Sequence, residues 1–261
     1  SEAELLAMYN DGVGFSDPSL DASGKKLGNK TAAYHYSSLV KPMFDAMLSK
    51  QANVVMPAVN LGTIAAPGVA GEYTGAGGRS VKVDEKGFEM NQIFTKSLMG
   101  ALVTDQIINS YLWRGKLDSG TNIANNDNLV FEYTSPNGAS VTKMEHYWDE
   151  GFGYLYGEDS QYSQDLGSGV LILKYGGKGD VAGLEKELYD AFKLGRAAIV
   201  AGDYDLRDKQ AKIIKVGVSK IIGYRAAYYL RSGGTKIDSG KWADALHALS
   251  EGYGFVLSLQ F

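Results

Sequence analysis

Two of the three histidines in this chain stand in the same sequence pattern, and each has a glutamate four residues further on. The first copy places Glu150 after His146, and the second places Glu251 after His247. Residues four apart on a helix lie on one face, one turn apart, so each imidazole would point the same way as its carboxylate. Such a pair can bind a metal ion, or its two members can hydrogen-bond to each other.

The similarity between the two stretches extends beyond these four residues. Each contains His, three residues, Glu, Gly, an aromatic residue, Gly and a second aromatic residue, as in H-Y-W-D-E-G-F-G-Y and H-A-L-S-E-G-Y-G-F. We interpret this similarity as an internal duplication. The two glycines in each copy cost a helix roughly 2 kcal/mol relative to alanine. We therefore expect another helix or a ligand to approach closely at these positions.

If the two copies face each other across a pseudo-twofold axis, their side chains could form one metal site. Two nitrogen and two oxygen ligands are a mixed set that suits iron, zinc or manganese. Asp149 and Glu145 are candidates to supplement the first copy. We predict iron or zinc as the bound metal and no catalytic residues. The predicted metal ligands are His146, Glu150, His247, Glu251 and Asp149.

Two alternatives to a metal site remain open. In the first, each His–Glu pair is structural and sets the register of two helices. Function would then lie on the long loops at 52–86 and 114–138, which would bind a protein or a glycan through residues such as Tyr73 and Trp113. The second is a metallopeptidase-like hydrolase. Because the chain has neither an H-E-x-x-H nor a G-x-S-x-G motif, we expect a non-enzymatic protein.

The composition is that of an ordinary globular protein. Of the 261 residues, 44% are hydrophobic and 21% are charged, which allows a sizeable core. The net charge of -4 argues against nucleic acid as a partner. The absence of cysteine excludes disulfides, thiolate metal sites and cysteine nucleophiles. Because the sequence opens with Ser1 rather than Met, we expect a processed or trimmed form.

Apolar residues at helical spacing predict the elements that would position the two motifs. The expected helices cover residues 88–113, 139–156, 181–201, 206–230 and 241–261. Each half is thus a long helix followed by a motif helix, which predicts an all-α helical bundle of two pseudo-twofold related repeats with long irregular loops. We place repeat one at about 87–157 and repeat two at about 181–261. Both follow an N-terminal extension over 1–86 in a single domain, 1–261.

Four further predictions concern local structure outside the motif helices. Residues 1–30 are expected to be irregular, and a helix is expected over 38–51. The segment 52–86 is predicted to be a long loop with a short hairpin around Tyr73 and Val81. We expect a solvated polar insertion over 116–137 and a short strand over Val170–Leu173.

Asp105 lies on the apolar stripe of the helix predicted over 88–113. A carboxylate on an apolar face is costly unless it is paired. Asp105 is therefore expected to be either a partnered structural residue or part of a site.

Three runs of sequence carry a family resemblance. They are A-A-P-G-V-A-G-E-Y-T (65–74), E-M-N-Q-I-F-T-K-S-L-M-G-A-L (89–102) and H-Y-W-D-E-G-F-G-Y-L (146–155). Together they resemble an uncharacterised domain family of bacterial envelope lipoproteins, and most of the chain is similar to the imelysin-like group. The signature of that group is a histidine with an acid three residues on. Asp149 fits this spacing after His146, whereas Ser250 takes the place after His247.

The resemblance implies a helical protein of two related bundles, exported to the periplasm or to the outer-membrane surface. It implies a cell-envelope binding protein that takes part in iron or other metal acquisition. The expected partners are a metal ion or an iron-bearing small ligand, together with an outer-membrane transport partner. Contact with a membrane would come only through a lipid anchor removed from this chain.

Overall fold

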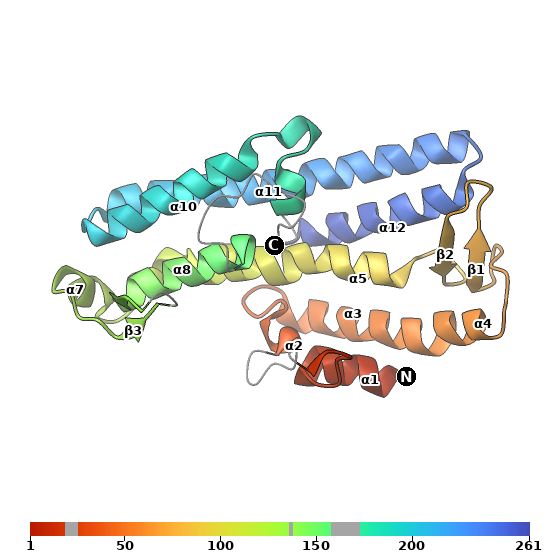
Figure 1. Cartoon of the computed structure of the whole chain (residues 1–261), viewed down its shortest axis with the longest axis horizontal. Coiled ribbons are helices and arrows are strands. Elements are labelled where there is room, and N and C mark those ends of the chain that lie inside the picture. Colours follow the sequence, from red (N-terminus) through yellow and green to blue (C-terminus); the bar gives the residue numbers. More distant parts are fainter. Residues whose placement is uncertain (19–25, 136–137, 158–172) are drawn as a thin grey trace. The chain divides into compact units, whose positions relative to one another are not determined.

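The computed structural model describes residues 1–18, 26–135, 138–157 and 173–261. These residues are mostly helical, with two short antiparallel hairpins (Figure 1). The predicted helical class is therefore confirmed. The chain divides into two compact units: unit 1 is Ser1–Leu102 with Ile222–Phe261, and unit 2 is Val103–Ile221. The first boundary falls inside predicted repeat one, and the second falls inside predicted repeat two.

Unit 1 combines the N-terminal elements with the C-terminal helix of the chain. Its elements are α1 (Glu2–Leu6), η1 (Ala7–Asp11), α2 (Leu27–Lys30), α3 (Ser37–Lys50), η3 (Gln51–Val55), α4 (Met56–Asn60), β1 (Gly71–Thr74), β2 (Ser80–Val83), α5 (Met90–Leu98) and α12 (Trp242–Ser258). The boundaries of the unit fall within η4 (Met99–Thr104) and α11 (Tyr204–Asp238).

Unit 2 is continuous in sequence. Its remaining elements are η5 (Ile107–Tyr111), α6 (Arg114–Leu117), α7 (Asn122–Asp127), β3 (Tyr133–Thr134), β4 (Ser140–Val141), α8 (Lys143–Tyr156), α9 (Leu173–Gly176), η6 (Gly179–Val181) and α10 (Leu184–Val200). The motif helices are thus α8 in unit 2 and α12 in unit 1. Of the strand predicted over Val170–Leu173, residues 170–172 lie outside the described residues.

The N-terminal segment is helical, so the prediction of irregular structure over 1–30 is wrong for α1, η1 and α2. A capping box starts α1, because the Ser1 hydroxyl accepts from the Glu4 backbone N–H and the Glu4 side chain returns to Ser1. Leu5, Leu6 and Tyr9 then follow at helical spacing and pack against a core cluster that includes Phe44. The Asp, Gly and Ser content of the segment concealed this short apolar stripe.

The predicted helix over 38–51 is confirmed as α3, but helical structure continues through η3 and α4 to Asn60. Its buried stripe runs along Val40, Phe44 and Met47, while Leu39 is exposed. The hairpin predicted around Tyr73 and Val81 is confirmed, because these two residues pair across β1 and β2. Residues 61–70, 75–79 and 84–86 are loop or turn, as expected, but residues 52–60 are helical, so the prediction of a loop is wrong for that part.

Helices α5 and α12 lie side by side in unit 1 (Figure 1). Near the end of α12, the Ser258 hydroxyl lies 2.6 Å from the Lys96 carbonyl oxygen and 3.0 Å from that of Ser97, and donates to them. Its oxygen accepts from the Gly100 backbone N–H at 2.8 Å. Helix ends leave unpaired backbone groups, and π-helical turns displace further ones. One buried hydroxyl therefore serves three backbone groups where α5 passes into η4.

The prediction of a solvated loop over 116–137 is only partly right. Residues 128–134 are exposed, but residues 122–127 form α7, in which Asn122 and Asn126 are buried, and residues 136–137 lie outside the described residues. The Asn126 amide donates to the Ile199 carbonyl at 2.8 Å, while its oxygen accepts from the Thr142 hydroxyl at 2.7 Å. Buried amides are stable when hydrogen-bonded in this way. Asn126 thus attaches the segment to α10 and to Thr142, the N-cap of α8.

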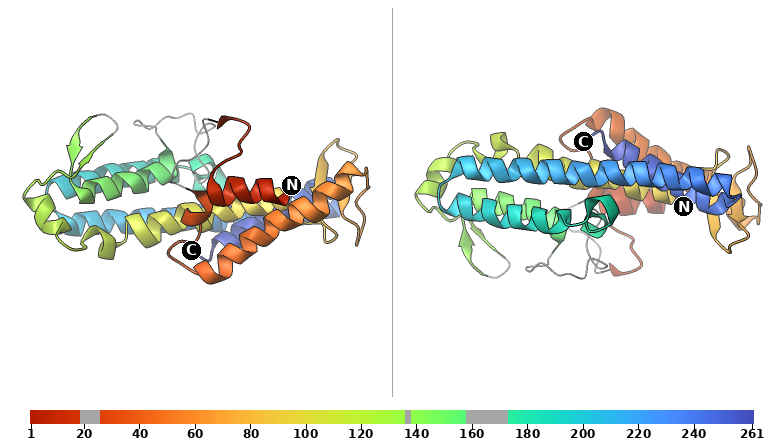
Figure 2. Two further views of the ribbon diagram at one scale, coloured as in Figure 1. Left: turned by 90° about the horizontal axis from the view of Figure 1, so that it is seen from below. Right: turned by 90° about the horizontal axis from the view of Figure 1, so that it is seen from above.

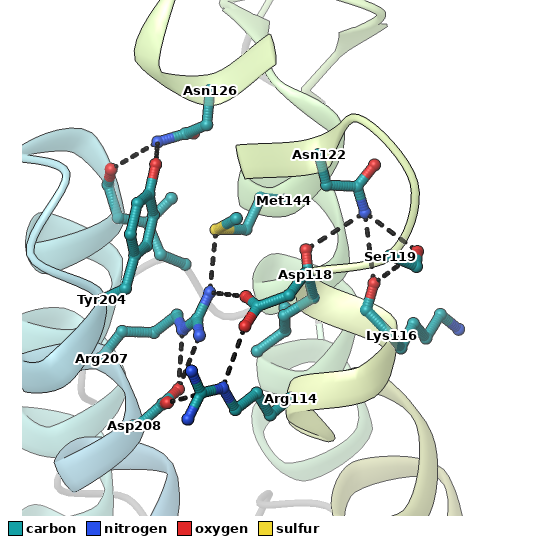
Figure 3. A network of polar contacts seen from close by, with 12 residues as sticks. Arg114, Lys116, Asp118, Ser119, Asn122, Asn126, Met144, Tyr204, Arg207 and Asp208 are labelled. Carbon is teal, nitrogen blue, oxygen red and sulfur yellow. Dashed lines mark hydrogen bonds and ion pairs between the residues drawn. The ribbon is translucent and has the colours of Figure 1, made fainter. Parts of the chain in front are cut away.

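Arg207 lies at the centre of a polar network in unit 2 (Figure 3). Its side chain is 0% exposed. Its Nη1 donates to Asp118 Oδ1 at 2.7 Å and to Met144 Sδ at 3.2 Å, and its Nε donates to Asp208 Oδ1 at 2.9 Å. Arg114, which is 75% exposed, also pairs with Asp118, at 3.0 Å. A buried charge requires such partners, so Arg207 holds α11 to the segment that follows α6.

We predict that Arg207→Met lowers the free energy of unfolding by roughly 3 kcal/mol, because it leaves Asp118 and Asp208 without their buried partner. Arg114→Met is the matched control, since it removes an exposed partner of the same two acids and should change stability little. Urea denaturation of both variants measures the difference. Equal losses in the two variants would contradict the role given to Arg207.

The same pair of variants should differ in pH dependence. Burial acts to raise the pKa of Asp118, but the bonds from Arg207 and Arg114 outweigh it and lower that pKa below its usual 3.8. A carboxyl with a lowered folded-state pKa stabilises the protein above its unfolded pKa, and this stabilisation is lost as the pH falls through the folded pKa. The gap between wild type and Arg207→Met should therefore narrow in acid.

Candidate functional site

The first motif pair lies on α8 in unit 2. His146 Nε2 lies 3.7 Å from Glu150 Oε1, and the two side chains are 31% and 24% exposed. The His146 ring stacks on Tyr133 of β3, with ring centroids 4.0 Å apart and planes 3° apart. The stacking fixes the plane of the imidazole. The helix thus presents one nitrogen and one carboxylate together at a partly exposed position.

A capping box positions the start of α8. The Glu145 backbone N–H donates to the Thr142 hydroxyl at 3.3 Å, and Glu145 Oε2 accepts from the Thr142 backbone N–H at 2.6 Å. The other carboxylate oxygen, Oε1, accepts from Arg196 Nη1 at 2.6 Å. Both oxygens of Glu145 are therefore engaged in structural bonds, although the sequence made this residue a candidate supplementary ligand.

Asp149 has a similar attachment to α10. Its Oδ1 accepts from Arg196 Nε at 2.9 Å. Burial raises the pKa of Asp149, and the nearby Arg196 opposes this shift without cancelling it. Arg196 therefore bridges two acids one turn apart on α8. This arginine was not singled out from the sequence, because it lies 47 residues beyond Asp149.

The second motif pair lies on α12 in unit 1, in a different environment. His247 Nδ1 lies 2.7 Å from Glu89 Oε2, and its Nε2 lies 3.5 Å from Glu251 Oε2. The opposite oxygen of Glu251 pairs with Lys96 Nζ at 3.2 Å. Both glutamates are only 9% exposed. Each nitrogen of His247 thus faces a carboxylate, in a chain of four charged or chargeable groups.

This arrangement does not suit a single metal ion shared by Glu89, His247 and Glu251. The two nitrogens of an imidazole point away from each other, so one ion cannot join Glu89 and Glu251 to the same ring. Glu89 was also missed as a partner of His247, from which it is separated by 158 residues. Its place just before α5 gave a local signal only for a helix start. Its backbone N–H donates to the Ser250 hydroxyl at 3.0 Å, which gives Ser250 a structural role.

The structure thus brings each histidine together with its own glutamate, but in two different units. A joint site of all four residues stays a prediction. Within the described ranges, no group of three or more histidine, aspartate or glutamate side chains has an arrangement that could hold a metal ion. Asp105, the acid on the apolar stripe, is fully buried and accepts a hydrogen bond from the Asn109 amide at 2.9 Å. It is a partnered residue.

The family described as Domain of unknown function (DUF4856) matches residues 1–261. The chain belongs to the DUF4856 family. Neither the curated proteins nor the solved structures gave a match.

The glycines of the repeated pattern show how the two motif helices of this DUF4856 domain pack. A Cβ added at Gly151 would lie 3.3 Å from Leu112, and one at Gly252 would lie 3.0 Å from Leu230. Each of these leucines follows a tyrosine in the long helical segment that precedes the motif. That tyrosine contacts the second aromatic residue of the motif in both places, as Tyr111 with Tyr154 at 5.6 Å and Tyr229 with Phe255 at 5.7 Å.

The second glycine behaves differently in the two copies. A Cβ at Gly254 would lie 2.6 Å from the Lys96 Cβ and 2.8 Å from the Ile93 carbonyl oxygen, whereas a Cβ at Gly153 would meet no atom of the described residues within 4 Å. Close approach of another helix therefore explains Gly151, Gly252 and Gly254, as the sequence led us to expect. It does not explain Gly153.

We predict opposite effects of alanine at these equivalent positions in the DUF4856 domain. Gly254→Ala should lower the free energy of unfolding by about 1–3 kcal/mol, because α12 and α5 must separate to admit the methyl group. Gly153→Ala should raise it by roughly 0.5–1 kcal/mol, because alanine favours the helix and meets no neighbour. Chemical denaturation followed by circular dichroism measures both. A neutral Gly254→Ala would show that the two helices are not in tight contact.

Proposed function

We propose that this DUF4856 domain is a non-enzymatic binding protein of the bacterial cell envelope that takes part in the acquisition of iron or another metal. The observation that carries the proposal is the geometry of His146 and Glu150. Their ligating atoms are 3.7 Å apart on one side of α8, and both side chains are reachable from solvent.

The chemistry of this pair fits a metal ion. Metal–nitrogen and metal–oxygen bonds of about 2.0–2.2 Å place two neighbouring ligands on one ion roughly 3.0–3.4 Å apart. A small rotamer change at His146 or Glu150 would reach that separation. Two protein ligands leave the other coordination positions open, and water or the oxygen atoms of an iron-bearing small ligand would fill them. A site of this kind exchanges its metal readily, which suits acquisition better than permanent storage.

The second copy has a structural role in this proposal. Glu89, His247, Glu251 and Lys96 connect α5 to α12 in unit 1, and their opposite charges offset the cost of partial burial. The metal would therefore bind at the first copy. A four-ligand site, in which His247 and Glu251 bind the same ion as His146 and Glu150, is a second form of the proposal and requires both pairs to converge. In either form, Asp149 could become a ligand only if it left Arg196.

We also propose that this domain arose by duplication of one helical unit. The shared contacts of Gly151 with Leu112 and of Gly252 with Leu230 support two pseudo-twofold related repeats of the kind found in the imelysin-like group. The location in the envelope, as a lipoprotein with an outer-membrane transport partner, is supported by the resemblance of the three sequence runs. Among the described residues, no helix has the length and hydropathy needed to cross a membrane.

We expect Fe(II), Fe(III), Zn(II) or Mn(II) to raise the melting temperature of metal-free protein, because an ion that binds only the folded state stabilises it. His146→Ala and Glu150→Gln should each abolish the shift. Differential scanning fluorimetry before and after addition of each metal measures it. His247→Ala is the matched variant, and its metal-induced shift, taken relative to its own metal-free baseline, should persist.

The response of these variants distinguishes a metal bound by the pair on α8 from a metal bound by the four-ligand site. Loss of the shift in both His146→Ala and His247→Ala would favour the four-ligand site over the pair on α8. A wild-type protein whose melting temperature responds to none of the four metals would overturn the metal-binding function altogether.

A second candidate function is a protein- or glycan-binding surface on the long loops. Trp113, Leu129 and Phe131 are exposed in unit 2, and Leu61 and Ile64 are exposed in unit 1. Exposed aromatic and aliphatic residues in loops are typical of interaction surfaces. Tyr73, which the sequence also suggested as a contact, packs against the cluster that contains Val81. This function would persist if the metal response failed.

A further inference from the structure

Helices α8 and α10 pack against each other in unit 2 (Figure 2). Their side chains enclose a small cavity. Its volume is about 190 Å³. It is lined by Trp148, Asp149, Phe152, Tyr189, Phe192, Lys193 and Arg196. Neither His146 nor Glu150 lines it, so the cavity is distinct from the metal-binding pair.

The wall of the cavity is aromatic and held in place by its own contacts. Phe152 meets Phe192 edge to face at 5.6 Å and Tyr189 at 6.0 Å. Trp148 is buried and its Nε1 donates to the Phe192 carbonyl oxygen at 2.8 Å. Because that N–H is already used, the indole adds an apolar surface rather than a polar contact. A wall of this kind favours a planar, apolar group.

The rim of the cavity carries hydrogen-bond donors. Arg196 uses Nε and Nη1 for Asp149 and Glu145, and its Nη2 bonds to no residue in the described part of the chain. Lys193 likewise forms no ion pair or hydrogen bond with the residues that the structure describes. Two acids already orient the guanidinium, so little ordering is needed when its remaining donors bind a ligand.

Charge and size narrow the class of ligand. Two cationic side chains at the rim disfavour an amine, although an aromatic wall alone would accept one. Guanidinium and ammonium donors prefer carboxylate or phosphate oxygens. The Asp149 carboxylate also lines the cavity, but it already pairs with Arg196 Nε at 2.9 Å, which reduces the repulsion that it would exert on an anion. The cavity is smaller than the roughly 300 Å³ at which typical ligand pockets begin, so a single ring fits better than a nucleotide or a peptide.

We propose that the cavity between α8 and α10 binds a small aromatic carboxylate. The ring lies against Phe152 and Phe192, and the carboxylate accepts from Lys193 Nζ and Arg196 Nη2. The site is independent of the metal-binding function.

Benzoate is the probe that tests this site, with benzylamine and benzyl alcohol as cationic and neutral counterparts of similar size. We expect saturable binding of benzoate in isothermal titration calorimetry and saturation-transfer NMR, with much weaker binding of the other two. Lys193→Gln should weaken benzoate binding about tenfold, since it removes a charge-assisted hydrogen bond. Lys186→Gln, on the same helix but outside the cavity, should leave binding unchanged.

Phe152→Leu provides a second test from the aromatic wall. It should weaken benzoate binding while leaving the circular dichroism spectrum unchanged, and cyclohexanecarboxylate should then bind the variant about as well as benzoate does. The proposal is overturned if benzoate shows no saturable binding, if benzylamine binds more tightly than benzoate, or if Lys193→Gln and Lys186→Gln behave alike.

Discussion

The pairing of buried charges is the constraint on which most of this structure depends. Arg207 has no access to solvent and is held by its neighbour Asp208 and by Asp118, which lies 89 residues away in the chain. A charge removed from water costs several kcal/mol unless opposite charges and hydrogen bonds surround it. Each such group therefore specifies which elements must meet. In unit 1 the same constraint acts through Lys96, Glu251, His247 and Glu89, and it brings the start of α5 to the middle of α12.

The pairing of charges also makes the environments of the two motif copies different. Their sequences place an imidazole and a carboxylate one helical turn apart in the same way, yet their surroundings differ. His146 has the flat face of Tyr133 beside it, which leaves its Nε2 toward Glu150. His247 has a second carboxylate, Glu89, at its other nitrogen. Identical local spacing thus yields an accessible pair in one unit and an internal ionic network in the other. Only contacts from elsewhere in the chain distinguish them.

Local patterns predicted the helices and the hairpin because their causes are local. Apolar residues at helical spacing located α5, α8, α10, α11 and α12, and the turn between Tyr73 and Val81 fixed the strand pairing. The same reasoning failed for α1, η1, α2 and α7, where polar composition suggested irregular chain. Asn126 is buried there because the Ile199 carbonyl and the Thr142 hydroxyl satisfy it, and no local pattern contains those partners. The roles of Glu89 and Arg196 were not predicted for the same reason, because they come from tertiary contacts with His247 and with the acids of α8.

Unit 1 is discontinuous, because Ser1–Leu102 is completed by Ile222–Phe261 and the whole of unit 2 comes between them. On a nascent chain, the face of α5 that carries Ile93 and Lys96 therefore stays exposed until Ile222–Phe261 has left the ribosome. Unit 2, being continuous, has all of its partners available much earlier during synthesis. Contacts of long sequence separation form slowly, and apolar surface left uncovered meanwhile attracts other chains. Because of this connectivity, α5 needs protection from association with other chains during translation.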